Sequence, residues 1–369
     1  MALAIAEITK ELESIAPKSL AYFSKDNNGL LVGDSSQKVN KVMVTLDITE
    51  DIMEYAIKSK CDLIISHHPI IFGGIDKIDT KSKTGRIIIK AIQNNISIYA
   101  AHTNLDVAWG GVNDSLAKKL GLKVTGVLDK IEASKYYKVV VFVPLDYKEK
   151  VLDAMAQQGA GNIGDYSHCT FTTLGEGTFK PLEGSNPFLG ETGNLETVKE
   201  VKIESIVSSD RLGGVLSGMK NAHPYEEVAY DVLPLQNNPD VYGLGRTTVL
   251  EAPITSIELA NHVKKELNCT AVKFFGDKGK KVSKVAVLGG SGGSLIKKAK
   301  KLNCHAIITS DVDYHQGQLA DELDICIIDP GHYHTEVVIV EDIAQKLNKV
   351  FSGKVDFQTA LNNCPYSYI

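Results

Sequence analysis

The sequence predicts an α/β protein made of two pseudo-symmetric α/β halves with a smaller domain inserted between them. A strand–helix–strand pattern occurs near the start of the chain and again near its end. The two copies align without a gap, because Lys41 matches Lys284 and Cys61 matches Cys304, an offset of 243 residues in both cases. Between the copies the pattern changes. We therefore expect a first half at 1–130, an inserted domain at 131–239 and a second half at 240–369.

In the first half, apolar residues recur at helical spacing across 3–16, and Pro17 ends that predicted helix. A buried strand is then predicted at 41–47, a helix at about 49–60, and a second strand that ends at His67. The second half repeats this order, with a strand at 284–290, a helix at about 294–302 and a strand at 304–311. Each copy is thus a βαβ unit.

The region between the halves has the element order of a ferredoxin-like domain. Its predicted elements are strand, helix, strand, strand, helix and strand, at 136–144, 147–157, 169–173, 200–207, 210–221 and 226–233. A long excursion with Gly, Asn and Pro separates the second strand from the third, from Gly175 to Gly193. His223-Pro-Tyr-Glu-Glu227 precedes the last strand and fits either a surface turn or an interface or effector site.

Composition places the chain among soluble globular proteins. Of its 369 residues 43% are hydrophobic and 23% are charged, and the formal net charge is -5. Without a basic surplus, nothing supports nucleic-acid binding. No apolar run approaches the roughly 18 residues that a spanning helix needs, and the acidic first segment does not fit a signal peptide. The six cysteines form no C-x-x-C pair, so the expected compartment is the reducing cytoplasm.

The most informative motif is Ser66-His-His-Pro69, where a buried strand ends. Neighbouring side chains of a strand point to opposite faces, so adjacent histidines serve one site only where the pleat breaks, and the proline supplies that break. The alternative is one structural and one surface histidine. Each half also places a histidine after a strand and a carboxylate four residues later: His102 with Asp106, and His332 with Glu336.

Together these motifs predict a metal site at strand ends, where ligands gather in open α/β sheets. The candidate ligands are His67, His68, Asp106, His332 and Glu336. Three imidazoles and two carboxylates exceed what one ion with an open position needs, and they suit two bridged ions. Nitrogen and oxygen ligands without thiolate favour zinc, iron, manganese, cobalt or nickel. For His332 and Glu336, the alternative is the polar start of the last helix.

Other polar groups in the same stretches carry weaker signals. His102, His315, His334 and Asp311 are candidates to orient ligands or to carry a proton, and a structural role is equally open for each. Gly289-Gly-Ser-Gly-Gly293, between a strand and a helix, fits either a phosphate-binding turn or a tight turn without a ligand.

With these residues in hand, the chain resembles the NIF-three-like family, whose members are often labelled GTP cyclohydrolase 1 type 2 homologues. The matching motifs span nearly the whole chain: Ser66-His-His-Pro69, His102-Thr-Asn-Leu-Asp106, Gly243-Leu-Gly-Arg246, Thr309-Ser-Asp311 with Tyr314-His315, and Gly331-His-Tyr-His-Thr-Glu336. The resemblance implies a dinuclear divalent-metal site on the ligands named above, a toroidal homohexamer, and an insert similar to CutA or PII-like proteins. One departure is Lys25, which stands where the family usually has tryptophan.

The leading interpretation is a cytoplasmic metal-dependent hydrolase acting on a nucleotide-like or phosphorylated small molecule, with two divalent ions per subunit, zinc, iron or manganese. Glu336 or Asp106 is expected to bridge the ions, and His102 or His315 to carry the proton. The alternative is a non-catalytic metal-binding or regulatory ring-shaped scaffold whose insert senses an effector. Catalysis needs an open position that faces a cavity, whereas protein encloses structural ions completely.

Overall fold

The computed structural model describes residues 3–24, 26–131, 135–164, 166–237 and 241–367. The chain forms two compact units, Met1–Ile131 with Val241–Ile369, and Glu132–Asp240. The second unit, called the insert below, holds the residues expected to form the inserted domain. Lys25 lies outside the described residues.

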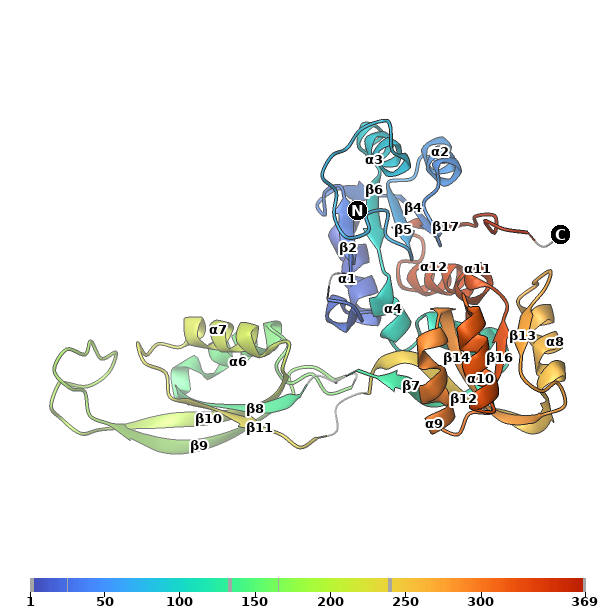
Figure 1. Cartoon of the computed structure of the whole chain (residues 1–369). Coiled ribbons are helices and arrows are strands. Elements are labelled where there is room, and N and C mark those ends of the chain that lie inside the picture. The colour runs from blue at the N-terminus through green and yellow to red at the C-terminus, as the bar shows by residue number, and fades with distance from the viewer. Residues whose placement is uncertain (1–2, 25, 132–134, 165, 238–240, 368–369) are drawn as a thin grey trace. The chain divides into compact units, whose positions relative to one another are not determined.

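The first unit contains two large sheets, of which the first has five strands in the order β17-β4-β5-β6-β2. The central three strands are parallel neighbours. Helices α2 and α3 pack on one face of this sheet, and α1 and α12 pack on the other (Figure 1). The elements are α1 (Ile5–Ile15), β2 (Gly29–Val32), β4 (Lys41–Thr45), α2 (Glu50–Lys58), β5 (Leu63–Ser66), α3 (Lys83–Gln93), β6 (Ser97–Ala100), α12 (Val338–Val350) and β17 (Asp356–Ala360).

The second sheet has six strands in the order β13-β16-β15-β14-β12-β7, and β14, β15 and β16 are again parallel neighbours. Helices α9 and α10 pack on one face, and α5 and α8 on the other. The elements are α5 (Val112–Lys119), β7 (Lys123–Lys130), β12 (Gly243–Thr255), α8 (Ser256–Glu266), β13 (Lys273–Phe275), β14 (Lys281–Ser291), α9 (Ile296–Lys301), β15 (Ala306–Ser310), α10 (Tyr314–Glu322) and β16 (Cys326–Asp329).

The three parallel strands of each sheet share their order, and the first two also share their register. Val42 of β4 pairs with Leu63 of β5, and Val285 of β14 pairs with Ala306 of β15, so both partners move by the same offset of 243 residues. These strands are buried on both faces, where a slipped register would misplace every apolar side chain. The carboxyl ends of the parallel strands therefore lie on the same side of each sheet, and the loops that follow these ends carry the polar residues.

Short elements complete the first unit. Strands β1 (Leu3–Ala4) and β3 (Lys38–Val39) form a separate pair. Two short helices, α4 (Thr103–Val107) and α11 (His332–Glu336), follow β6 and β16. Among the residues that the structure describes, no helix combines the length and the apolar character needed to cross a bilayer.

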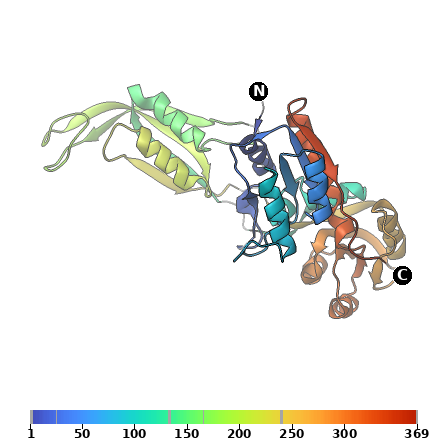
Figure 2. The same ribbon diagram turned by 90° about the horizontal axis from the view of Figure 1, so that it is seen from above.

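The insert is an antiparallel sheet of four strands, ordered β11-β8-β10-β9, with α6 and α7 on one face (Figures 1 and 2). Along the chain the elements are β8 (Tyr136–Pro144), α6 (Lys148–Gln157), β9 (Thr170–Phe179), β10 (Glu196–Ser208), α7 (Leu212–Ala222) and β11 (Tyr230–Pro234). The expectation that the loop begins at Gly175 was wrong, because β9 continues to Phe179 and pairs with β10 throughout. Glycines do not end this strand because the ladder bonds continue through Gly175 and Gly177.

Candidate metal centre

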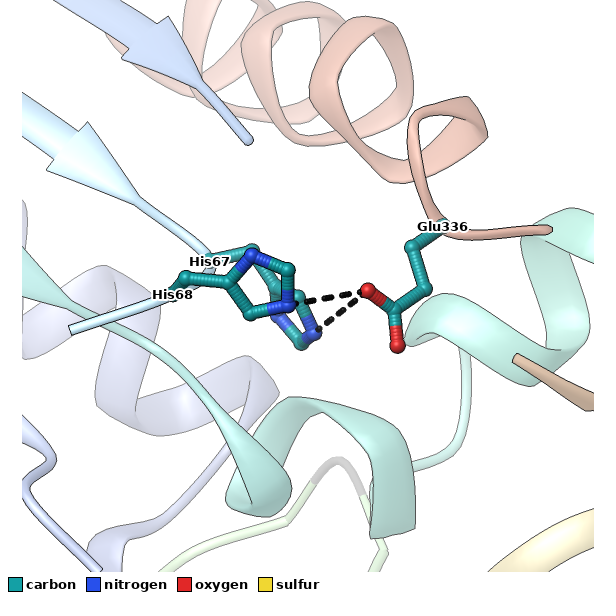
Figure 3. A group of neighbouring side chains, drawn as sticks. All are labelled: His67, His68 and Glu336. Carbon is teal, nitrogen blue, oxygen red and sulfur yellow. Dashed lines mark ion pairs between the residues drawn. The ribbon is translucent and has the colours of Figure 1, made fainter. Parts of the chain in front are cut away.

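The end of β5 brings two adjacent imidazoles to one side of the sheet. The backbone amides of His67 and His68 bond to the carbonyls of Thr45 and Leu46, at 3.2 and 3.0 Å, as the chain leaves the strand. Both rings then direct Nε2 toward Oε2 of Glu336, at 3.8 Å from His67 and 3.0 Å from His68 (Figure 3). These three residues form a compact group whose donor atoms all lie within 4.8 Å of one another.

Two further predicted ligands border the same group. His332 and Glu336 lie four residues apart on α11, so they share a helical face, and His332 Nε2 is 3.0 Å from Glu336 Oε2. Asp106, on α4, places Oδ1 3.7 Å from His67 Nε2. The structure therefore places the three histidines within 4 Å of the buried carboxylate of Glu336 and Asp106 beside His67.

The donor atoms fit a divalent cation. His67 Nε2, Asp106 Oδ1 and Glu336 Oε2 are buried, and in the described part of the chain none of them has a hydrogen-bond partner. Buried polar atoms are normally partnered, so an unpartnered group of nitrogen and oxygen atoms indicates a ligand. Ligands about 2.1 Å from one ion are typically 3–4 Å apart, and the separations here are 3.0–3.8 Å.

The other nitrogen of each imidazole is held by a hydrogen bond. His67 Nδ1 donates to the carbonyl of Ala101 at 2.9 Å. His68 Nδ1 donates to Asp47 at 2.8 Å, and His332 Nδ1 donates to Asp311 at 2.6 Å. These bonds leave each Nε2 facing the centre, which is how outer residues orient metal-binding histidines.

Burial and carboxylate contacts set the charge state of the protein without metal. Burial lowers the pKa of His67 to about 4, so this imidazole is neutral at pH 7. Burial also opposes charge on His68 and His332, but contacts with Glu336 and with Asp47 or Asp311 outweigh it, raising their pKa values to about 10 and about 9. A cation therefore displaces protons from these two rings when it binds.

The pKa values of the two carboxylates, Glu336 and Asp106, shift in opposite directions. Burial disfavours the charged form of both. For Glu336 the neighbouring imidazoles outweigh burial and hold the pKa well below its usual range. For Asp106, burial together with the nearby charge of Glu336 raises the pKa well above its usual range. A divalent cation would remove this conflict by placing positive charge beside both groups.

Four of the candidate ligands, His68, Asp106, His332 and Glu336, line a cavity of about 620 Å³. Its lining comprises Tyr22, Phe23, Asp47, His68, Pro69, Phe72, His102, Thr103, Asp106, Leu244, Leu288, Gly289, Ser291, His332 and Glu336. Phe23 and Phe72 are 59% and 71% exposed, so apolar rings border the entrance. No Lys or Arg occurs among the described residues of this lining.

A model of the family described as Duf34/NIF3 (NGG1p interacting factor 3) matches residues 3–364. The chain belongs to the Duf34/NIF3 family. The "GTP cyclohydrolase 1 type 2 homolog" of Halalkalibacterium halodurans is 44% identical over 344 residues, which cover 93% of this chain and 91% of the relative. The homologue of the same name from Bacillus subtilis is 42% identical over 348 residues, 94% of this chain and 93% of the relative.

Solved structures agree with this family assignment. The crystal structure of a Bacillus cereus protein related to NIF3 covers 100% of both chains with a TM-score of 0.85 and 41% identity. The Staphylococcus aureus protein SA1388 covers 100% of this chain and 99% of its own, with a TM-score of 0.78 and 30% identity. The resemblance drawn from the sequence motifs is thus confirmed at the level of the family.

Other residues predicted from the sequence lie at different distances from the centre of this NIF3 protein. His102 lines the cavity, and its Nδ1 donates to Asp26 at 2.6 Å. His315 is exposed on α10, where Nδ1 lies 3.1 Å from Gln318 Oε1, and it is absent from the described lining. His334 is half-buried on α11, and burial lowers its pKa. A proton-transfer role for His315 stays a prediction.

The glycine-rich stretch of this family member makes room for Glu336. The amide of Gly289 bonds to Asn113 and that of Gly290 to Thr335, so neither is free to bind phosphate. An added Cβ at Gly290 would overlap Glu336 Oε1, and φ there is +67°. Close packing therefore explains the first two glycines, Gly289 against Val112 and Gly290 against the candidate ligand Glu336, although a phosphate-binding turn was one of the two interpretations of the sequence.

Sequence reasoning missed two carboxylates of the site. Asp47, which orients His68, lies two residues after the end of β4. Asp26, which orients His102, belongs to an Asp-Asn-Asn-Gly turn. The signal for Asp47 is its position after a strand that neighbours β5. The signal for Asp26 is weak, because Asp is common in turns for local reasons.

Proposed function

We propose that this protein is a metal-dependent hydrolase with two divalent ions, bound by His67, His68, Asp106, His332 and Glu336. The observation that carries the proposal is a set of buried nitrogen and oxygen atoms without hydrogen-bond partners, on His67, Asp106 and Glu336, of which the last two residues line an open cavity. Divalent ions at such a site supply Lewis-acid catalysis for hydrolysis. Zinc, iron and manganese all accept this ligand set.

Within this proposal, Glu336 is the carboxylate that would be shared by the ions. Its Oε2 faces the Nε2 atoms of three imidazoles, whereas the Asp106 carboxylate has one imidazole, that of His67, within 4.0 Å among the described residues. His102 is the residue that transfers the proton. Its bond to Asp26 fixes the ring and leaves Nε2 as the nitrogen available to a substrate.

The cavity favours a substrate with a planar, largely neutral ring. Tyr22, Phe23 and Phe72 provide aromatic surface, and the Phe72 ring meets the His102 ring at a centroid distance of 5.5 Å. The described lining offers no Lys or Arg to bind a phosphate, so recognition of a nucleotide would rest on its base and on the metal. Relatives named GTP cyclohydrolase 1 type 2 homolog are consistent with hydrolysis of such a ring.

The alternative is a protein that only holds its ions as part of a scaffold. Structural ions are enclosed by protein, with no open position. Here the side chains of His68 and His332 are 23% and 35% exposed, and both line the cavity. This exposure supports catalysis over storage.

The test is a substrate screen with purified protein loaded in turn with Zn²⁺, Fe²⁺ and Mn²⁺, using GTP, other nucleotides and phosphoesters. We expect turnover that depends on the metal and disappears in Glu336→Gln. His102→Gln should keep its metal but lose most activity. His315→Gln tests the other predicted proton carrier, and because His315 is exposed and outside the described lining we expect this variant to keep its activity. Full metal content with no turnover of any compound would refute the hydrolase and leave the scaffold.

We also propose that the two α/β halves are pseudo-symmetric and that the insert is a ferredoxin-like, CutA- or PII-like domain. The shared strand register supports the first idea, and the βαββαβ order supports the second. A homohexamer in the cytoplasm remains part of this proposal. Light scattering tests the assembly, with six times the chain mass expected and a monomer or dimer contradicting it.

A further inference from the structure

The insert contains a second cavity, of about 610 Å³, built entirely from its own residues. It lies where the β9–β10 ribbon extends beyond β8, because Pro144 at the end of β8 already pairs with Glu200, four residues inside β10. The loop between β9 and β10 contributes Pro181, Ser185, Pro187, Phe188 and Leu189 to the lining. This volume is within the range of small-molecule sites.

Three of the four aromatic rings in the lining of this cavity lie close together. The centroids of Phe179 and Phe188 lie 5.8 and 6.2 Å from that of Tyr225, and all three residues belong to the lining. They come from β9, from the loop after it and from the segment before β11. Aromatic faces gathered in this way attract organic cations through the ring quadrupole.

A carboxylate lies among these rings. Glu200 on β10 is only 9% exposed, and the Tyr225 hydroxyl donates to its Oε1 at 3.2 Å. A Cβ at Gly177, on the neighbouring strand, would overlap Glu200 Oε2, so this glycine leaves space for the carboxylate. A buried carboxylate is costly unless a positive group or several hydrogen bonds compensate it.

The charges around the cavity also favour a cation. Glu176, Glu226 and Glu227 join Glu200 in the lining, while Lys202 is the single basic residue among the described lining residues. That lysine already pairs with Glu204, at 3.1 Å. The cavity therefore combines apolar and aromatic walls with an excess of negative charge.

The His223-Pro-Tyr-Glu-Glu227 motif gains a role from this arrangement. His223 is 7% exposed, its Nε2 donates to the carbonyl of Phe142 at 2.9 Å, and its Nδ1 accepts from the amide of Tyr225 at 3.1 Å. The histidine therefore fixes the segment so that Tyr225 and the two glutamates face the cavity. The two interpretations of the motif from the sequence were a surface turn and an interface or effector site, and its place in this lining supports the second.

We propose that this cavity binds a small organic cation, an ammonium or guanidinium compound with an apolar or aromatic body. Glu200 pairs with the cationic head, and Phe179, Phe188 and Tyr225 enclose it. The inference is independent of the metal centre, because it uses residues of the insert alone.

Titration calorimetry on the full-length protein tests the proposal with benzyltrimethylammonium, 3-phenylpropanol and 3-phenylpropionate as cationic, neutral and anionic probes. We expect the cation to bind at least tenfold more tightly than either of the other two. Glu200→Gln, which keeps the shape and removes the charge, should abolish that preference. Asp153→Asn, which removes an exposed carboxylate on α6 outside the lining, should keep it.

A second variant fills the space without touching the carboxylate. Gly175 lines the cavity and an added Cβ meets no atom within 4 Å, so Gly175→Trp should fold and lose binding of the cation. The proposal is wrong if the wild-type protein binds no cation at millimolar concentration, if Glu200→Gln binds it equally well, or if neutral and cationic probes bind alike. It is also wrong if Gly175→Trp leaves cation binding intact and changes only the number of subunits, which would identify an interface between copies.

Discussion

Substitution of Gly290 by alanine separates backbone strain from the placement of Glu336. Gly290 has φ +67°, in the left-handed region, and an added Cβ would overlap Glu336 Oε1. Gly121, between α5 and β7, has nearly the same φ, +65°, but its Cβ would meet nothing within 4 Å. The two variants therefore share the backbone cost, and only Gly290→Ala displaces a ligand.

The expected magnitudes follow from these two terms. A non-glycine residue in the left-handed region costs about 1–2 kcal/mol, so Gly121→Ala should lower the free energy of unfolding by that amount. Gly290→Ala adds an overlap in a packed interior, which costs about 1–3 kcal/mol more. Because Glu336 must move away from His68 and His332, we also expect metal affinity to fall at least tenfold. A loss of this size is typical when a residue that orients a metal ligand is removed.

Urea unfolding of metal-free protein gives the stability of both variants, and competition with a chromophoric chelator gives the affinity for Zn²⁺. Gly121→Ala should bind Zn²⁺ like the wild type despite its loss of stability. If both variants lose the same stability and both keep wild-type affinity, Gly290 does not make room for Glu336 and the explanation of the glycine-rich stretch is wrong.

Three further outcomes are expected. Arg246 is fully buried and donates to Asp114 at 2.8 Å and to the carbonyl of Ala108, just after α4, at 2.6 Å. Arg246→Met leaves Asp114 without this partner, so it should lower the free energy of unfolding by about 3–5 kcal/mol in urea melts. A change under 1 kcal/mol would contradict this account. Asp311 has a left-handed φ of +56°, which asparagine also tolerates, so Asp311→Asn should leave the circular dichroism spectrum unchanged. The substitution weakens the hydrogen bond that orients His332, so Zn²⁺ affinity should fall about 10–100-fold. Removal of metal by chelation should lower the melting temperature, because ions that bind only the folded state stabilise it; equal melting temperatures with and without chelator would argue against bound ions.

The βαβ units were predictable because their signals are local. Thr49 precedes the helix that follows β4, and its side chain accepts a hydrogen bond from the amide of Ile52, as an N-cap does. The buried strands are continuous apolar runs, which is typical of parallel sheets. Their boundaries came within a few residues, for example 41–47 expected against Lys41–Thr45 observed.

Other elements have no comparable local signal. Strand β12 pairs with β7, from which it is separated in sequence by the whole insert, and with β14. Its residues are partly polar and partly exposed, so no alternation predicts the strand. Strand β17 joins the first sheet beside β4 from the far end of the chain. Pairings of this kind depend on packing between distant segments.

The ligands of the candidate site were predictable because several histidines and carboxylates follow strands in a repeated pattern. The structure places His67, His68 and Glu336 together. The supporting residues were harder to find, since one aspartate after a strand, such as Asp47, is unremarkable by itself. The glycine-rich stretch was ambiguous because nothing local shows that Gly290 lies against a carboxylate 46 positions later in the chain.

The place of β17 and α12 implies that the two sheets are not separable folding units. Both elements come from the second half of the sequence, yet they pack on the first sheet, β17 as a parallel neighbour of β4. A polypeptide cut within the insert would leave each fragment with exposed apolar surface that only the other fragment covers. Such fragments, produced separately and mixed, should reassemble by complementation, and the reassembled pair should recover a centre for which neither fragment carries all the ligands.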